Sequence, residues 1–268
     1  MTDAYDLDAG RPETQARQTA LERASDAVAA QPGAVLGLAY GAHPRQRIDV
    51  FPAAPDAPIF VFFHGGYWRA GSREARRFPA PAWRARGVTW AVAGYRLVTD
   101  APLAASVADA RAAIAFLAQQ RDALGLGAAP LHLCGNSAGG HLAAMAAAAG
   151  WDGRPDIASL TTLSGLHDLR PLVRCNPNAW LKLTDGRAAE LSPILHLPPT
   201  DLPVLVGWGG AETAAFIAQS ELYAAMLKAA GNPAATVVSP GEDHFEVIAG
   251  LGAEAHPIFQ AMREMVSR

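Results

Sequence analysis

The sequence predicts an α/β protein built on a doubly wound, mostly parallel sheet, and two observations carry this prediction. Continuous apolar runs such as 59–63 and 89–93 are typical of strands that are buried on both faces. These runs alternate along the chain with stretches of helical periodicity. That alternation is the order expected when helices cover both faces of a parallel sheet.

The elements follow one another in a regular order. Helical periodicity over residues 12–30 ends at Pro32 and Gly33. Two antiparallel strands are expected next, at 34–40 and 47–51, around a turn at 41–44. Strands are then expected at 59–63, 89–93, 131–134, 157–163, 204–206 and 236–239, and helices at 101–124, 138–149, 213–230 and 255–266.

The chain is expected to form a single domain over residues 1–268, because one doubly wound sheet can hold this length. Within it, residues 1–33 are an N-terminal helical segment. Residues 166–197 carry Pro, Asn and Gly between short helical pieces. They predict a small cap-like insertion over the carboxyl edge of the sheet.

Composition excludes several classes of protein. Half of the residues are hydrophobic and 18% are charged, which is a globular balance rather than a disordered one. The net charge is −3 and no basic block is present, so nucleic acid is not an expected partner. The polar, acidic N-terminus and the shortness of every apolar run predict a cytoplasmic protein with no membrane partner.

No cofactor or metal is expected. The two cysteines, Cys134 and Cys175, are too few for a disulfide framework or a zinc site. The histidines lack metal-ligand spacing, and the glycine-rich stretches match neither G-x-G-x-x-G nor a P-loop. The oligomeric state stays open, with a homodimer as one alternative.

A nucleophile is indicated by Gly135-Asn136-Ser137-Ala138-Gly139, which reads G-x-S-x-G. It stands between an expected strand and an expected helix, as a nucleophile elbow requires. Earlier in the chain, His64-Gly65-Gly66 directly follows the run 59–63. Such a segment supplies backbone N–H groups to an oxyanion hole. We therefore expect Gly65 or Gly66 to act as a donor together with Ala138.

A serine nucleophile needs a base and an acid that orients the base. His244 lies in a polar loop after the last expected strand and is the candidate base. Glu212 follows the strand at 204–206 and is the candidate acid. Asp168, which follows the strand at 157–163, is its main rival, and Asp243 ranks low because it adjoins the histidine.

Large side chains adjoin each of these loops. Tyr67, Trp68, Trp208 and Phe245 are neighbours of the proposed site in sequence and predict an aromatic-lined pocket. Together with Asn136, beside the nucleophile, they are candidate substrate-binding residues. The expected ligand is a small aryl amide or ester.

These motifs together resemble the α/β-hydrolase fold, in the H-G-G branch shared by esterases and kynurenine formamidases (arylformamidases). The resemblance to the formamidases is closer and covers about residues 35–250. It is carried by HGGYW at 64–68, GNSAGGHL at 135–142 and SGLHDLRPL at 164–172, with the loops at 212–220 and 243–245. Two positions depart from the family pattern: Asn136 stands where His is usual, and Glu212 where Asp is common.

The resemblance implies a triad of Ser137, Glu212 and His244 and the hydrolysis of N-formyl-L-kynurenine to kynurenine and formate. A short-chain carboxylesterase with the same triad is the alternative reading. A third, from another class, is an inactive hydrolase fold that serves for binding.

Overall fold

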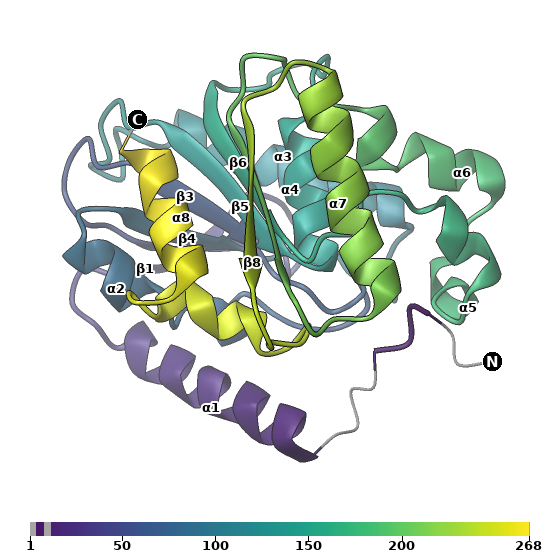
Figure 1. The fold of residues 1–268 in the computed structure, drawn as a ribbon. Coiled ribbons are helices and arrows are strands. Elements are labelled where there is room, and N and C mark those ends of the chain that lie inside the picture. Colours follow the sequence, from purple (N-terminus) through teal and green to yellow (C-terminus); the bar gives the residue numbers. More distant parts are fainter. Residues whose placement is uncertain (1–3, 8–11, 268) are drawn as a thin grey trace.

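A computed structural model describes residues 4–7 and 12–267, which form one eight-stranded sheet with helices on both sides (Figure 1). The strand order is β1-β2-β4-β3-β5-β6-β7-β8. The strands are β1 (Val35–Ala39), β2 (Arg47–Phe51), β3 (Ile59–Phe63), β4 (Thr89–Ala93), β5 (Leu131–Asn136), β6 (Ile157–Leu163), β7 (Val204–Gly209) and β8 (Ala234–Ser239). All pairs from β4 to β8 are parallel, whereas β1–β2 and β2–β4 are antiparallel. The predicted mostly parallel sheet is confirmed.

The helices lie between the strands in sequence. They are α1 (Pro12–Ala29), α2 (Ala80–Ala85), α3 (Leu103–Gln119), α4 (Ala138–Ala147), α5 (Asn178–Leu181), α6 (Asp185–Glu190), α7 (Ala214–Ala229) and α8 (Pro257–Val266). Four 3₁₀ turns complete the described elements: η1 (Glu74–Arg76), η2 (Arg170–Arg174), η3 (Pro193–Leu195) and η4 (Val247–Gly252).

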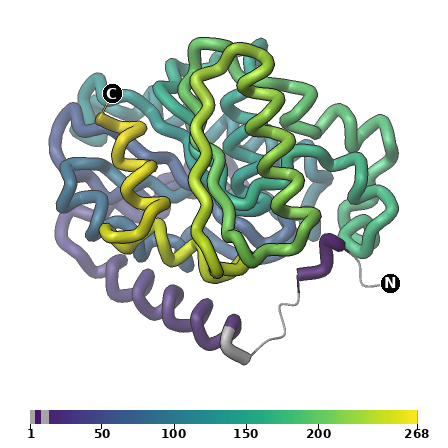
Figure 2. Tube along the Cα trace, in the orientation of Figure 1, coloured from purple at the N-terminus to yellow at the C-terminus, as the bar shows by residue number. Residues whose placement is uncertain are grey.

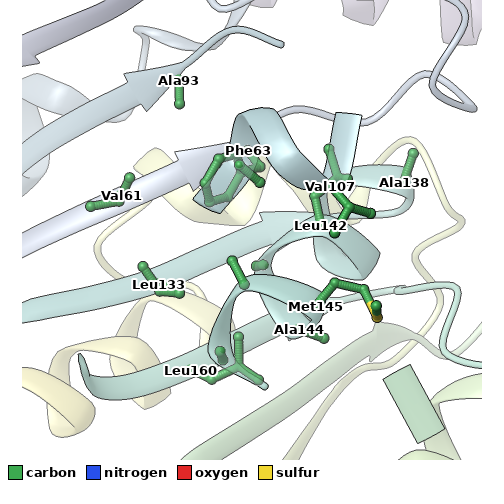
Figure 3. Close-up of a cluster of buried hydrophobic side chains, with 14 of the residues drawn as sticks. Val61, Phe63, Ala93, Val107, Leu133, Ala138, Leu142, Ala144, Met145 and Leu160 are labelled. Atoms are coloured by element: carbon green, nitrogen blue, oxygen red, sulfur yellow. The ribbon is translucent and has the colours of Figure 1, made fainter. Parts of the chain in front are cut away.

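Each face of the sheet has its own hydrophobic core, and the strands alternate between the two. In β3, Val61 and Phe63 belong to the core under α3, α4 and α7, whereas Phe60 and Phe62 belong to the core under α2 and α8. Successive side chains of a strand point to opposite faces, so a continuous apolar run serves both layers. Figure 3 shows Val61, Phe63, Leu133 and Leu142 in one of these two cores, with Phe63 of β3 beside Leu142 of α4.

Several elements differ from the sequence prediction, among them helices α3 and α2. Helix α3 ends at Gln119 rather than near 124, and the chain then turns through Gly125 at a φ of 66°. Helix α2 was not predicted, because the prolines around it resemble a loop. Proline is tolerated in the first turn of a helix, and α2 carries Trp83 fully into the core.

The N-terminal segment reaches the same end of the molecule as the insertion at 166–197. Figure 2 shows residues 4–7 beside the part of the chain that carries α5. Tyr5 and Trp180 line one cavity, which agrees with this view. Two segments far apart in sequence therefore border the same site.

Candidate active site

Ser137 stands on a strained turn between β5 and α4. Its backbone has φ 53° and ψ −123°, a conformation that costs energy for a residue other than glycine and that clusters at functional sites. The turn is held by a hydrogen bond from the Ser137 N–H to the carbonyl of Leu163, at 2.8 Å. The flanking glycines are needed for space, because a Cβ on Gly139 would overlap the carbonyl of Phe63 and one on Gly135 would overlap that of Gly139.

A buried carboxylate holds the ring of His244. Oε2 of Glu212 lies 2.7 Å from Nδ1 of His244, and both side chains are buried. The other oxygen, Oε1, accepts hydrogen bonds from the Ser164 hydroxyl at 2.5 Å and from the Gly209 N–H at 2.7 Å. The carboxylate is therefore fixed from two sides. The contact on Nδ1 leaves Nε2 as the ring nitrogen for proton exchange.

The rival carboxylates have other partners. Asp168 accepts hydrogen bonds from the Arg170 guanidinium at 2.8 and 2.7 Å. Asp243 accepts from the backbone N–H groups of Phe245 and Glu246. Of the three carboxylates that the sequence offered, the structure brings Glu212 to the histidine.

Ser137 and His244 line one cavity of about 420 Å³. Within the described residues, no hydrogen bond joins the Ser137 hydroxyl to the histidine ring. In unliganded enzymes such contacts are often long and tighten only when substrate is bound.

The two glycines after His64 have different hydrogen bonds. The N–H of Gly65 donates to Oδ1 of Asn136 at 3.1 Å. Among the residues that the structure describes, the backbone N–H groups of Gly66 and Ala138 have no hydrogen-bond partner. Gly66 has a φ of 115° and a Cβ there would overlap the carbonyl of Ala70, so this position requires glycine. Two backbone donors therefore remain available near Ser137, from Gly66 and Ala138.

Three of the predicted pocket residues line the cavity: Tyr67, Asn136 and Phe245. The two tryptophans lie in the hydrophobic core instead. Trp68 is fully buried, with its ring centroid 4.9 Å from that of His141. Trp208 lies on β7 on the same face as Val206, so its side chain points into a helical layer. Nearness in sequence to a catalytic loop did not decide which way these rings point.

The structure adds lining residues that the sequence analysis missed. They come from residues 4–7, α1, the chain around η1, the insertion and η4, and they are Tyr5, Asp6, Leu7, Gln18, Glu22, Arg69, Ala70, Gly71, Arg76, Asn176, Pro177, Trp180 and Ile248. None of them stands in a motif. Ser164, which supports Glu212, does lie in the quoted segment SGLHDLRPL, and its φ of 51° marks it as unusual.

Residues 4–7 are tied to the rim of the site by specific contacts. The hydroxyl of Tyr67 donates to the carbonyl of Tyr5, and Gln219 donates to the Tyr5 hydroxyl at 2.9 Å. The Thr213 hydroxyl donates to the carbonyl of Ala4 at 3.0 Å. This segment therefore forms part of the cavity wall.

Two histidines near the elbow are structural. Burial lowers the pKa of His64 to about 3 and that of His141 to about 4. The ring of His64 stacks on Tyr95 at 4.3 Å between centroids, and Nε2 of His141 lies 2.7 Å from the carbonyl of Leu191. Neither ring is placed to serve Ser137 as His244 is.

Two further findings concern residues 4–7 and 12–267 alone. No group of three His, Cys, Asp or Glu side chains there is arranged to hold a metal ion. None of the helices in that part combines the length and apolar character needed to cross a bilayer.

Comparison with known proteins agrees with this site. The family model described as BD-FAE matches residues 51–162, which include both the H-G-G segment and the elbow. A kynurenine formamidase of Danio rerio is 27% identical over 265 residues, or 95% of this chain and 89% of that protein. One of Salmo salar is 28% identical, covering 93% of this chain and 88% of that protein.

Solved structures show the same fold. A Silicibacter protein provisionally described as a thioesterase superposes with a TM-score of 0.86 at 26% identity, covering 99% of this chain and 98% of that one. An esterase of Pyrobaculum calidifontis gives a TM-score of 0.73 at 22% identity, covering 98% and 96%. The chain has the α/β-hydrolase fold and is a hydrolase of the arylformamidase and esterase type, similar to both kynurenine formamidases and esterases.

Proposed function

We propose that this enzyme hydrolyses N-formyl-L-kynurenine to kynurenine and formate, with Ser137 as the nucleophile. The observation that carries the proposal is the buried Glu212–His244 pair, 2.7 Å apart, in the same cavity as a serine on a strained elbow. The relatives named kynurenine formamidases align over 95% and 93% of the chain, which supports the choice of substrate.

The chemistry follows the roles of a serine triad. Nε2 of His244 takes the proton of Ser137 while its Oγ attacks the formyl carbonyl, and the buried Glu212 stabilises the imidazolium that forms. The imidazolium then protonates the leaving aryl nitrogen, and the C–N bond breaks. Water, activated by the same histidine, hydrolyses the formyl-enzyme and releases formate.

The negative oxygen of each tetrahedral intermediate needs preorganised donors. The N–H groups of Gly66 and Ala138 are available for this role because no described group uses them. Gly65 contributes differently, since its N–H is bonded to Asn136 and holds the two loops together. Loss of one such donor typically costs about 10²–10³ in kcat.

A formyl group suits this site because it has no substituent beyond its carbonyl. The acyl end therefore needs little room beside the bulky Tyr67, which lines the cavity. A cavity of about 420 Å³ lies within the usual range for small-molecule sites, so the aryl amine also fits.

The deciding experiment follows the absorbance change as N-formyl-L-kynurenine becomes kynurenine, with the unmodified enzyme and Ser137→Ala side by side. Turnover that is lost in the variant supports the proposal. If only p-nitrophenyl acetate is cleaved through Ser137, the enzyme is a carboxylesterase. If neither substrate is cleaved and a fluorophosphonate probe does not label Ser137, the fold serves for binding.

A further inference from the structure

The wall of the cavity also carries charge that the reaction does not use. Two guanidiniums, of Arg69 and Arg76, and two carboxylates, of Asp6 and Glu22, line it. Within the described residues, none of these four side chains forms an ion pair with another. Uncompensated charge in a cavity wall is costly unless a ligand satisfies it.

Arg76 is the most constrained of these groups. Its Nη2 donates to Oε1 of Gln18 on α1, and its Nη1 to the carbonyl of Ala75, both at 2.9 Å. Its Nε is buried without a hydrogen-bond partner among the described residues. Burial lowers the pKa of Arg76, and the charge of Glu22 partly opposes the shift. The guanidinium is held in place, yet no carboxylate of the described residues forms an ion pair with it.

Arg69 presents a second guanidinium to the same cavity. Its Cζ lies 4.1 Å from the centroid of the Trp180 ring, an arrangement that holds a guanidinium flat while leaving its edge N–H groups for another partner. Trp180 comes from the insertion and Arg76 from η1. Arg69 and Arg76 both come from the chain between β3 and α2, so one segment brings both positive charges to this wall and the insertion holds one of them in place.

We propose that this wall recognises the α-amino-acid end of the substrate, with Arg76 and Arg69 on its carboxylate and Glu22 on its ammonium group. The inference rests on the proposed function, because the formyl end must lie at Ser137 for the other end to reach this wall. Among its described residues the wall carries two positive and two negative groups, which matches a zwitterion better than a simple acid. Arginine also binds carboxylates with a planar pair of donors.

The test uses four formamides that share one reacting group: N-formyl-L-kynurenine, its analogue without the amino group, its analogue without the carboxylate, and 2′-formamidoacetophenone, which lacks both. We expect kcat/KM to fall at least about tenfold when the carboxylate is removed, the usual size of a charged hydrogen bond. Removal of the amino group should cost less, because Glu22 is exposed. Equal rates on all four formamides would overturn the inference while leaving the formamidase activity intact.

Variants then assign the effect to residues. In Arg76→Gln, the ratio of kcat/KM for N-formyl-L-kynurenine to that for 2′-formamidoacetophenone should fall about tenfold, and in the more exposed Arg69→Gln about threefold. A ratio cancels any general loss of folded enzyme. Arg23→Gln is the matched control, because Arg23 is exposed on α1 next to Glu22 and does not belong to the lining. An unchanged ratio in Arg76→Gln and Arg69→Gln would contradict the assignment.

A second measurement separates this inference from the proposed function. If no formamide is hydrolysed, the proposed function fails, but inhibition of p-nitrophenyl acetate cleavage still reports on the wall. L-Kynurenine should then inhibit at least about tenfold more strongly than kynuramine, which lacks the carboxylate. Equal inhibition by the two amines would overturn the inference on its own.

Discussion

The inner and outer walls of the cavity are built in different ways. The inner wall carries Ser137 and His244, with Glu212 behind the histidine, after the carboxyl ends of the parallel strands β5, β8 and β7, where the backbone is closely packed. The outer wall comes from residues 4–7, α1, η1 and the insertion, which lie outside the sheet. The difference indicates that the sheet holds the chemical groups and that peripheral segments supply recognition.

Among the substitutions considered, Ser137→Ala is expected to cause the largest loss of activity and tests the role of the inner wall most directly. We expect kcat/KM to fall by about 10⁴-fold or more on both formamide and ester substrates, because the nucleophile is lost from every reaction of the inner wall. Steady-state absorbance assays with both substrates measure this loss.

The thermal midpoint should stay nearly unchanged in the variant, since one hydroxyl is removed and the strained backbone is kept. A variant that retained a tenth of the activity on either substrate would show that another group attacks the carbonyl.

The second prediction tests whether Glu212 or Asp168 is the acid that orients His244. Glu212→Gln should lower kcat/KM by about 10³–10⁴, because an amide cannot stabilise the imidazolium of His244 and can turn its NH₂ toward Nδ1. Asp168→Asn makes the same change of charge at the end of the neighbouring strand and should keep the activity within about threefold.

The Asp168 variant loses only its contact with Arg170, whose side chain is half exposed, so its stability should change by less than about 1 kcal/mol. The reverse order of the two activities would make Asp168 the acid.

The same division explains what could be predicted from the sequence. Positions 135, 139 and 66 require glycine, because a Cβ on Gly135, Gly139 or Gly66 would overlap a neighbouring carbonyl. The inner wall can therefore be recognised in the sequence as glycine-containing motifs. The strand β3 was predicted with its exact bounds because it is buried on both faces and reads as one apolar run.

The residues of the outer wall are not marked by any sequence motif. Arg76 and Glu22 need no special backbone, and only the way that α1 packs beside η1 brings them to the cavity. The direction of a side chain is also invisible locally, as Trp68 and Trp208 show: both adjoin the predicted loops, yet both point into the core. Tertiary packing decided these positions.

Ser164→Ala tests how the carboxylate of Glu212 is held in place, and its expected loss of activity is smaller. The Ser164 hydroxyl donates to Oε1 of Glu212 at 2.5 Å, and a hydrogen bond to a charged group contributes about 1.5–3 kcal/mol. We expect kcat to fall about tenfold with little change in KM, because the carboxylate that orients His244 becomes less fixed.

Ser159→Ala is the matched control for this variant. Ser159 is a buried serine of β6 whose hydroxyl lies 2.8 Å from Nδ1 of His132, away from the triad. Equal losses of kcat in the two variants would mean that the effect of Ser164 is a general loss of packing around β6.

The last prediction concerns the stability of the scaffold rather than the rate of the reaction. Burial lowers the pKa of His132 to about 4 and that of His167 to about 3, as it does for His64 and His141. Below a pH of about 6.5 these histidines bind protons in the unfolded chain but not in the folded protein. Their contribution to the free energy of unfolding is therefore fully present above that pH and is lost as the pH falls toward 4. Each such histidine should lower the free energy of unfolding by about 1.4 kcal/mol per pH unit in this window.

Urea unfolding at several pH values from 7.5 to 5 measures this slope. His132→Gln should reduce it by about 1.4 kcal/mol per pH unit, because the variant no longer releases a proton on folding. A stability that is flat between pH 7.5 and 5.5 would mean that water reaches these rings in the folded protein. The protein interior around these histidines would then be open to water, and burial would no longer distinguish the elements behind the inner wall from those of the outer wall.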